Sequence, residues 1–430
     1  MGEKAKQSFY IQGLGGRREL SGELPVRGAK NAVIKVLAAS LLFNDEVSLD
    51  NVPAIEDVAR TVELLTDLGV QVTDQGNGKL LLQTNDLKKS DLNPEIAKSL
   101  RTSIVLSGPL LARLGRVTFP YPGGCVIGKR PIDIFLDGFK KMGAVIKEEG
   151  ENYELTAPNG LSGAEIFLRV PSVTATETFL MAAVLAKGET VLKNVALEPE
   201  IKSLSEFLIS CGAQIAGLGT PTLIITGGGL LSGKGKTYTT LPDRIEAGSF
   251  LILAALLAKD VTITHCEPAH LDALINLLTQ AGVKMTVNKE SINIKGDQPE
   301  FKAVDVKTHE YPGFPTDLQA PLSVFLTQVS GQSFIFETIF EGRLNYLETL
   351  ARFGANTKVL DAHRAIIEGP SKLIGREVES PDLRAGLAYV LAALVAHGES
   401  IVHNVYYIDR GYERIDQRLA QLGATIRRAA

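Results

Sequence analysis

The 430-residue chain has only three cysteines, no low-complexity tract and no long hydrophobic run. Three cysteines in a chain of this length do not make the disulfide framework of a small secreted domain. The longest uninterrupted apolar run, Leu387 to Ala396, has ten residues, whereas a membrane-spanning helix needs about 20. The sequence therefore excludes a disulfide scaffold and a helical membrane protein, and we expect no membrane partner.

The chain also has little net charge, −4 at pH 7. A general nucleic-acid surface needs a local excess of Lys and Arg, so we expect no nucleic-acid partner, and any anion must be bound by individually placed cations. The first residues, MGEKAKQSFYIQG, lack the apolar core of a signal peptide and the Ser or Thr of a myristoylation signal. We therefore expect a cytoplasmic protein, while the oligomeric state stays open.

One supersecondary unit recurs six times along the chain. In each unit an amphipathic helix-like run ends at a glycine, and a strand-like stretch follows at once, as in LLTDLGVQV and LAQLGATIR. Glycine just past a helix ends it in the left-handed conformation. Successive glycines are 69 to 74 residues apart, which is too long for the common solenoids. The six positions are Gly69, Gly143, Gly212, Gly282, Gly354 and Gly423.

A second series of six positions marks the beginnings of more apolar helices. These helices are apolar nearly all round, which predicts that they are buried inside a shell of sheets and amphipathic outer helices. Each is followed by a stretch rich in strand-forming residues, such as KGETVLKNV. The first residues of the six helices are Lys30, Arg101, Thr174, Arg244, Asp317 and Arg384.

Four of these six positions are cationic, although a helix N-terminus disfavours Lys and Arg by about 0.3 to 1 kcal/mol. A cation beside the free amides of a helix start can hold a phosphate or a carboxylate. The series therefore indicates that the chain gathers anions. The alternative is that each cation is an ordinary surface residue where the chain enters a helix.

The spacing predicts an α/β protein of two domains with three units each. The boundary is expected near TYTTLPDR, where three units end. One domain then spans residues 30–240, and the other combines residues 1–29 with 241–430. If the N-terminal strand FYIQG pairs with the last unit, the chain passes twice between the domains.

Cys125 lies in the segment FPYPGGCVIGKRPIDI, where prolines and glycines interrupt regular structure. Exposed loops of this kind often carry chemistry, and the neighbouring Lys129 and Arg130 are placed to stabilise a thiolate or hold an anion. The alternative is a structural cysteine. Cys211 lies at an apolar cap position of the repeat and Cys266 follows a predicted strand, and we expect both to pack in the core.

Asp317 is the one acid in the helix-start series. It is either a helix N-cap, a role that Thr316 would also suit, or a general base surrounded by cations. In the second case its pKa would be low. It would then act through its position rather than through a pKa near neutrality.

Eight motifs in a fixed order make nearly the whole chain resemble the UDP-N-acetylglucosamine 1-carboxyvinyltransferases. The motifs are GAKNA, NVP, LRTSI, PGGCVIGKRP, LPDRIEAGSF, PGFPTDLQ, DLRAG and IDRGYERI. The resemblance implies an inside-out α/β barrel of two similar domains, each with a threefold repeat. It also implies transfer of the enolpyruvyl group of phosphoenolpyruvate to the 3-hydroxyl of UDP-N-acetylglucosamine in peptidoglycan precursor synthesis. Phosphate is released, no metal or organic cofactor is required, and fosfomycin is an inhibitor.

The resemblance further implies roles for individual residues. Cys125 would be the general acid, and Asp317 would accept the hydroxyl proton or orient the hydroxyl, with Lys30 and Arg410 also in the catalytic set. The residues implied to bind phosphoenolpyruvate are Lys30, Asn31, Arg130, Arg384 and Arg410. The residues implied to bind UDP-N-acetylglucosamine are Arg101, Arg130, Pro131, Ile132, Asp133, Ile134, Ser172, Val173, Asp317 and Ile339.

Two stretches depart from the family pattern. The chain reads SVTAT where relatives commonly read SVGAT, and VIK follows KNA where relatives usually have ALP. Thr174 thus adds a side chain where the backbone is implied to approach a diphosphate. Two alternatives stay open: the sister enzyme 5-enolpyruvylshikimate-3-phosphate synthase, which the Cys125 loop and the DRGYER ending disfavour, and a paralogue that binds a UDP-sugar without turnover.

Overall fold

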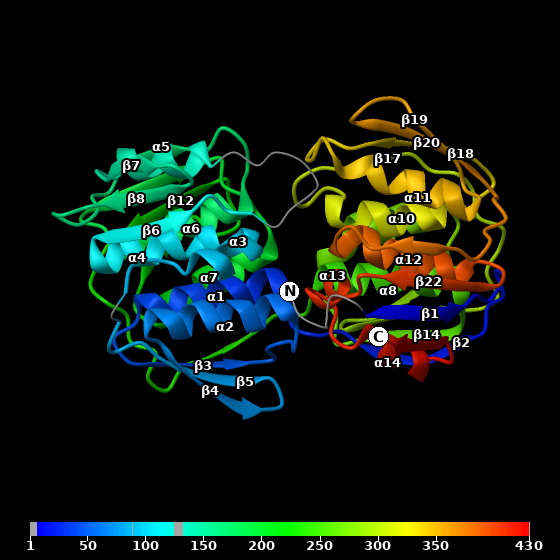
Figure 1. Ribbon diagram of the computed structural model, residues 1–430, viewed down its shortest axis with the longest axis horizontal. Coiled ribbons are helices and arrows are strands. Elements are labelled where there is room, and N and C mark those ends of the chain that lie inside the picture. The colour runs from blue at the N-terminus through cyan, green and yellow to red at the C-terminus, as the bar shows by residue number, and fades with distance from the viewer. Residues whose placement is uncertain (1–6, 88, 124–131, 430) are drawn as a thin grey trace. The chain divides into compact units, whose positions relative to one another are not determined.

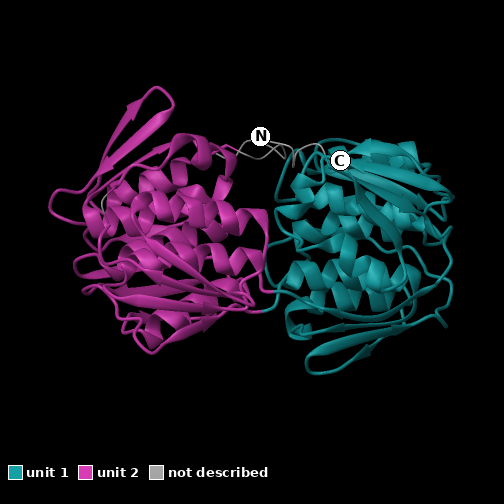
Figure 2. Cartoon of the chain, turned by 60° about the horizontal axis from the view of Figure 1, so that its bottom comes forward, with its two compact units in different colours: residues 1–27, 126–128, 242–430 teal, residues 28–125, 129–241 magenta. Residues whose placement is uncertain are grey.

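The computed structural model describes residues 7–87, 89–123 and 132–429. These residues form two compact units (Figure 2). Unit 1 contains residues 7–27 and 242–429, and unit 2 contains residues 28–123 and 132–241. The chain passes between the units at residues 27–28 and again at residues 241–242.

Unit 2 holds three copies of a buried inner helix, an outer helix and a small sheet (Figure 1). The inner helices are α1 (Lys30–Ala39), α4 (Ser107–Leu114) preceded by the 3₁₀ helix η3 (Arg101–Leu106), and α6 (Val173–Val184). The outer helices are α2 (Glu56–Leu68), α5 (Asp133–Lys141) and α7 (Pro199–Ser210), and a short α3 (Pro94–Ser99) precedes η3.

The three sheets of unit 2 have related strand orders. The first is β13 (Thr237–Thr239), β3 (Glu46–Asp50), β5 (Lys79–Gln83) and β4 (Gln71–Gly76). The second is β6 (Arg116–Pro120), β8 (Asn152–Thr156) and β7 (Val145–Glu149). The third is β11 (Gln214–Ala216), β12 (Thr222–Thr226), β10 (Glu189–Lys193) and β9 (Glu165–Phe167).

Unit 1 repeats this plan. Its inner helices are α8 (Arg244–Leu257), α10 (Gln319–Leu326) preceded by η5 (Thr316–Leu318), and α12 (Leu383–Val395). Its outer helices are α9 (Asp272–Gln280) preceded by η4 (Pro268–Leu271), α11 (Tyr346–Phe353) preceded by η6 (Arg343–Asn345), and α14 (Ile415–Gln421), and a short α13 (Tyr406–Asp409) follows the last inner helix.

The sheets of unit 1 also have one common order. The first is β15 (Thr286–Val287), β16 (Ser291–Lys295), β14 (Ala258–Thr264) and β2 (Leu20–Pro25). The second is β17 (Val306–Lys307), β18 (Gly331–Phe336), β20 (Arg364–Gly369) and β19 (Asn356–Val359). The third is β21 (Glu377–Glu379), β22 (Glu399–His403), β1 (Ser8–Gln12) and β23 (Thr425–Ala429).

The N-terminal segment completes unit 1. Strand β1 pairs antiparallel with both β22 and β23, so the predicted pairing of the N-terminal strand with the last repeat is confirmed. Strand β2 pairs parallel with β14, and in unit 2 β13 pairs parallel with β3 in the same way. Each unit therefore closes its set of three repeats with a strand that is distant in sequence.

The local signals that predicted the repeat are confirmed. All six glycines have positive φ, from 90° at Gly143 to 107° at Gly354. The six inner helices begin within one residue of the predicted positions. Two of them begin as 3₁₀ rather than α-helix, at Arg101 and Thr316. At Thr316 this agrees with Pro321, which lacks the N–H that an α-helix would bond to the Asp317 carbonyl.

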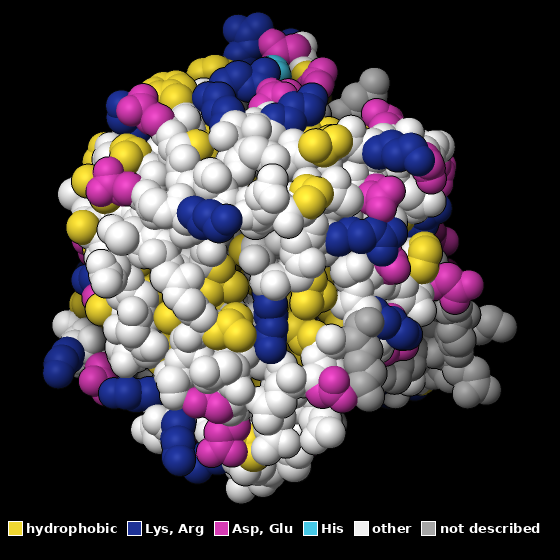
Figure 3. Space-filling view, turned by 90° about the vertical axis from the view of Figure 1, so that its left-hand side faces the viewer, with side chains coloured by type: hydrophobic (Ala, Val, Ile, Leu, Met, Phe, Trp, Pro, Cys, Tyr) yellow, Lys and Arg dark blue, Asp and Glu magenta, His cyan; other side chains and the backbone are white. Residues whose placement is uncertain are grey.

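Each unit has its own apolar core around the inner helices. Cys211 and Cys266 are buried in these cores as predicted, and burial raises the pKa of the Cys266 thiol to about 11. Within the described residues, the helices are all too short or too polar to cross a bilayer. Basic and acidic side chains are interspersed on the face of unit 2 that Figure 3 shows, so the described part of that face carries no single-sign surface.

One ion pair lies inside the core of unit 2, between α1 and α6. Lys35 Nζ lies 3.0 Å from Glu177 Oε2 and donates to the Asn31 carbonyl at 2.7 Å. Burial raises the pKa of Glu177 to about 7, because the opposing effect of Lys35 is itself offset by the nearby Glu200 and Glu198. The pair connects the first turn of α1 to the middle of the neighbouring inner helix.

This pair generates a pH-dependent expectation for stability. The folded protein keeps a proton on Glu177 that the unfolded chain releases near pH 4.5, so the free energy of unfolding falls as pH rises from about 4.5 to 7. Between pH 5 and pH 8, the free energy of unfolding of the natural protein should fall by up to about 3 kcal/mol more than that of Glu177→Gln. Urea unfolding at both pH values measures this difference. Glu63→Gln, a surface change in the same unit, is the control, and equal pH slopes for the natural protein and Glu177→Gln would contradict the expectation.

Candidate active site

Asp317 lies in the 3₁₀ turn that begins an inner helix of unit 1, and its carboxylate is held by two arginines. Oδ1 accepts from Arg343 Nη2 at 2.9 Å, and Oδ2 accepts from Arg384 Nη2 at 2.8 Å. The two arginine side chains are 4% and 7% exposed, while that of Asp317 is 26% exposed. A carboxylate reachable from solvent is therefore backed by two buried guanidinium groups.

The N-cap alternative for Asp317 is wrong. Leu318 occupies the N-cap position of α10, and no side chain makes a capping hydrogen bond there. Both Asp317 oxygens bind arginine instead. Asp317 is thus bound by cations, as the second interpretation of the sequence predicted.

Arg384 is fixed from three directions at the start of α12. Its backbone N–H donates to the N-cap carboxylate of Asp382 at 2.8 Å. Its Nη1 donates to the Tyr412 hydroxyl at 2.9 Å, and that hydroxyl lies 3.2 Å from Ser249 Oγ of α8. The guanidinium has little rotamer freedom left, so it presents its charge to Asp317 in one geometry.

The charges of this cluster determine its protonation. Burial alone would raise the pKa of Asp317, but the guanidinium of Arg384 and then that of Arg343 lower it well below its ordinary value. Burial lowers the pKa of Arg384, and Asp317 more than reverses this, so Arg384 stays protonated. Two cations and one anion leave these three side chains with a net charge of about +1 at neutral pH. The cluster can therefore accept a further anion.

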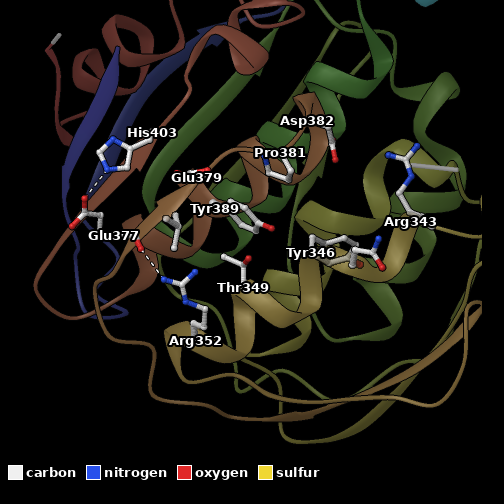
Figure 4. A pocket seen from close by; sticks show the side chains of 13 residues that line it. Arg343, Tyr346, Thr349, Arg352, Glu377, Glu379, Pro381, Asp382, Tyr389 and His403 are labelled. Carbon is white, nitrogen blue, oxygen red and sulfur yellow. Dashed lines mark hydrogen bonds and ion pairs between the residues drawn. The ribbon is translucent and has the colours of Figure 1, made fainter. Parts of the chain in front are cut away.

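A cavity of about 760 Å³ opens in unit 1 beside Arg343 (Figure 4). At one end His403 Nε2 lies 2.8 Å from Glu377 Oε1, and Arg352 donates to the Glu377 carbonyl at 3.2 Å. Glu377 therefore contacts both His403 and Arg352 at that end. At the other end lie Arg343 and Asp382, next to the Asp317 cluster.

In unit 2, Lys30 is the first residue of α1 and is mostly buried. Its Nζ lies 2.7 Å from Asp57 Oδ2 of α2. Asn31 follows in the same turn, and its carbonyl accepts from Lys35. The turn that carries both predicted phosphoenolpyruvate ligands is thus held by charged side chains of α1 and α2.

Arg101 begins η3, which packs against α1 and α6. Its Nη1 donates to the Pro122 carbonyl at 2.5 Å, and its guanidinium lies 5.8 Å from the ring centre of Tyr121. Arg101 therefore contacts the described start of the Cys125 segment. Cys125, Arg130 and Pro131 lie outside the described residues.

The starts of α5 and α6 are joined by an ion pair. Ser172 is the N-cap of α6 and accepts from Ala175 N–H at 3.3 Å, and Val173 is its first helical residue. Asp133, the first residue of α5, is paired with Arg169, which lowers the pKa of Asp133 despite partial desolvation. The remaining predicted ligands here are Ile132, which is buried, and Ile134, which is partly buried.

Thr174 occupies an ordinary helical position in α6. It is not among the residues with positive φ, so its backbone does not require glycine. Its carbonyl accepts from Thr178 Oγ1 at 2.7 Å. The substitution therefore changes side-chain space at this turn and leaves the helix intact.

The last two predicted residues lie in unit 1. Arg410 follows α13 and is two residues before Tyr412, whose hydroxyl binds Arg384. Ile339 follows β18, and its N–H donates to Glu337 Oε1 at 2.7 Å. The structure thus joins Asp317 to Arg384 directly, and it places Arg410 and Ile339 on neighbouring segments.

Sequence reasoning missed several partners of these residues. Arg343 and Tyr412 complete the Asp317 cluster, Asp57 pairs with Lys30, and Arg169 pairs with Asp133. None of them lies in the helix-start series, and only Tyr412 falls within one of the eight motifs. Over the described ranges, no group of His, Cys, Asp and Glu is arranged to hold a metal ion.

Comparisons with known proteins agree along almost the whole chain. A family model described as EPSP synthase (3-phosphoshikimate 1-carboxyvinyltransferase) matches residues 14–419. UDP-N-acetylglucosamine 1-carboxyvinyltransferase 1 of Caldanaerobacter subterraneus subsp. tengcongensis is 44% identical over 409 residues, which cover 95% of this chain and 97% of that protein. UDP-N-acetylglucosamine 1-carboxyvinyltransferase of Coxiella burnetii is 41% identical over 411 residues, which cover 96% and 94%.

Two solved structures share the fold. The enolpyruvyl transferase NikO from Streptomyces tendae matches with a TM-score of 0.88 at 23% identity, covering 99% of both chains. EPSP synthase from Acinetobacter baumannii matches with a TM-score of 0.75 at 21% identity, covering 99% of this chain and 100% of that one. At such identities the likeness shows the fold alone.

The Asp317 cluster generates a second expectation for stability. Asp317→Asn leaves two buried guanidinium groups without their carboxylate, which should cost about 3 to 5 kcal/mol at pH 7. Because the folded pKa of Asp317 is lowered, its contribution is complete above the unfolded value of about 3.9 and is lost as pH falls below it. Measured by urea unfolding, the free energy of unfolding that Asp317→Asn loses relative to the natural protein should therefore be smaller at pH 3 than at pH 7. Asp361→Asn, which breaks an exposed pair with Arg364, is the control, and a loss at pH 7 no larger than its own would refute the expectation.

Proposed function

This chain belongs to the UDP-N-acetylglucosamine 1-carboxyvinyltransferases, and from this membership we propose that it transfers the enolpyruvyl group of phosphoenolpyruvate to the 3-hydroxyl of UDP-N-acetylglucosamine. Phosphate leaves, and the product enters peptidoglycan precursor synthesis. The family predicted from the eight motifs is confirmed by relatives at 41% to 44% identity. The observation that supports the reaction most directly is the carboxylate of Asp317 held between Arg343 and Arg384.

The reaction needs two proton movements and a firm hold on anions. The sugar hydroxyl oxygen adds to C2 of phosphoenolpyruvate while a proton adds to its methylene carbon, which gives a tetrahedral ketal. Loss of phosphate and of one methyl proton restores the double bond. We assign protonation of the methylene carbon to Cys125 and acceptance of the hydroxyl proton to Asp317. The proposed ligands of phosphoenolpyruvate are Lys30, Asn31, Arg130, Arg384 and Arg410.

The geometry of Asp317 suggests when it becomes a base. Without substrate, Arg384 and Arg343 hold the pKa of Asp317 low, so its carboxylate is ionised but a weak base. A substrate anion that shares the Arg384 guanidinium weakens that ion pair and raises the proton affinity of Asp317. Asp317 therefore first orients the sugar hydroxyl and then takes its proton as charge develops on the oxygen.

The helix starts of unit 2 supply groups suited to the diphosphate of the sugar nucleotide. Free amides at the start of α6, beside Ser172 and Val173, favour an anion. Arg101 adds a guanidinium from the neighbouring η3. The other proposed ligands of the nucleotide sugar are Arg130, Pro131, Ile132, Asp133, Ile134, Asp317 and Ile339.

We also propose the finer description of the fold, an inside-out α/β barrel of six units. Its support is the position of buried inner helices within outer helices and sheets in each unit. As the family resemblance implies, the proposed reaction uses no metal or organic cofactor. The free, buried Cys211 and Cys266 suit the reducing cytoplasm.

Phosphate release is the test of the proposed function. The protein should release phosphate from phosphoenolpyruvate with UDP-N-acetylglucosamine and not with shikimate-3-phosphate, and Asp317→Asn should lower kcat by about 10²- to 10³-fold. Circular dichroism verifies that the variant is folded at the assay temperature. Release only with shikimate-3-phosphate would indicate the sister reaction. Calorimetric binding of UDP-N-acetylglucosamine without release would indicate the non-catalytic paralogue.

Alkylation by fosfomycin tests the assignment of Cys125. A reactive thiol beside a phosphate-binding cluster should open the epoxide of this phosphonate, so intact-mass spectrometry with UDP-N-acetylglucosamine present should show one adduct. Cys125→Asp should show none. Cys211 and Cys266 serve as internal controls, because burial raises the pKa of both thiols and keeps them protonated. An unchanged mass for the natural protein would refute the assignment.

A further inference from the structure

Glu337 follows β18 and is fully buried, and it lies outside the motifs and repeated positions of the sequence. Its carboxylate accepts four hydrogen bonds, two on each oxygen. Oε1 accepts from the backbone N–H groups of Ile339 at 2.7 Å and Phe340 at 3.0 Å. Oε2 accepts from Thr316 Oγ1 at 2.9 Å and Gln319 Nε2 at 2.6 Å. Four donors occupy acceptor sites on both oxygens of the carboxylate.

The Oε2 contacts lie on both sides of Asp317. Thr316 precedes Asp317 by one residue, and Gln319 follows it by two. The Gln319 amide is oriented from the other side as well, because its Oε1 accepts from the Tyr346 hydroxyl at 3.0 Å, and that hydroxyl lies 2.7 Å from Ser323 Oγ. Glu337 therefore holds the turn that carries the proposed base.

The Oε1 contacts lead to Arg343, a partner of Asp317 that was not predicted from the sequence. Glu337 orders the turn at Ile339 and Phe340. The Phe340 carbonyl accepts from Arg343 N–H at 3.2 Å, and the guanidinium lies 5.2 Å from the Phe340 ring centre. Arg343 then binds Asp317. The contacts form a closed ring that passes from Glu337 through both turns and returns at the Asp317–Arg343 ion pair.

We propose that Glu337 is a positioning residue for the reaction, which holds Asp317 and Arg343 in reacting geometry by bridging the two turns that carry them. It acts through its neighbours rather than on the substrate. The inference rests on the proposed function, because it takes Asp317 as the group that receives the hydroxyl proton. It also places Ile339, a proposed ligand of the nucleotide sugar, in the same ring.

The bridge needs a carboxylate. In Glu337→Gln one oxygen becomes an NH₂ group, which faces two donors and can accept from neither. Two of the four hydrogen bonds are then lost on one side of the ring, and the turn on that side can move. Displacements of about 1 Å in a catalytic arrangement can lower rates by about 10²-fold.

The test compares Glu337→Gln with Glu246→Gln. Glu246 is also a buried carboxylate of unit 1, bound to Arg418 and to the Arg27 N–H. We expect Glu337→Gln to lower kcat for phosphate release by about 10- to 100-fold. The acid limb of the kcat–pH profile of Glu337→Gln should also lie at higher pH than that of the natural protein, because a looser Arg343 contact raises the pKa of Asp317. Glu246→Gln should lose stability without either kinetic change.

A milder variant covers the case in which Glu337→Gln does not fold. Thr316→Val removes only one donor to Glu337 and should lower kcat several-fold. Thr327→Val, at the opposite end of the same inner helix, removes a buried hydroxyl that bonds the Val324 carbonyl and should leave kcat unchanged. Equal kcat values and pH profiles for Thr316→Val, Thr327→Val and the natural protein would overturn the proposal.

A double-mutant cycle separates this proposal from the proposed function. Urea unfolding of Glu337→Gln, Asp317→Asn and the double variant yields a coupling energy without any assay of activity. A coupling clearly different from zero supports the bridge even if the natural protein releases no phosphate. Additive losses of unfolding free energy would overturn the proposal even if the natural protein is active.

Discussion

The ion pairs of Asp317 with Arg343 and Arg384 are the constraint on which the candidate site of unit 1 depends. Two buried guanidinium groups need a counter-charge, since an unpaired buried charge costs several kcal/mol. Asp317 supplies only one negative charge, so the cluster stays net positive and suits an anionic ligand. The same contacts also keep the carboxylate ionised and oriented. Stability, anion binding and base chemistry in this unit therefore depend on one set of contacts.

The repeat explains why so much of the fold could be predicted from sequence. The signals are local and occur six times: a glycine with positive φ ends each outer helix, and a polar or charged residue lies within the first two residues of each inner helix. A wrong prediction for one repeat unit therefore does not change the predictions for the other units. The 3₁₀ start at Thr316 could also be predicted, because Pro321 cannot donate to the Asp317 carbonyl.

The partners of the site could not be predicted, because they lie outside the repeated positions. Arg343 lies 26 residues from Asp317 in sequence and belongs to neither repeated series. Tyr412 comes from the segment after α13, and Glu337 from the end of a strand. Contacts of this kind depend on how one repeat packs on the next, and spacing within a single unit carries no information about that.

Two of the buried ion clusters among the described residues show how the ratio of cations to carboxylates determines protonation. In unit 2, Lys35 is the one cation paired with Glu177, and Glu198 and Glu200 add negative charge, so burial dominates and the pKa of Glu177 rises to about 7. In unit 1, two guanidinium groups bind one carboxylate, so attraction outweighs burial and the pKa of Asp317 falls. A carboxylate that must orient a hydroxyl at neutral pH has to be ionised, and only the second arrangement secures this. In the proposed reaction, the excess of arginine around Asp317 therefore keeps the base ionised and also suits the binding of an anionic substrate.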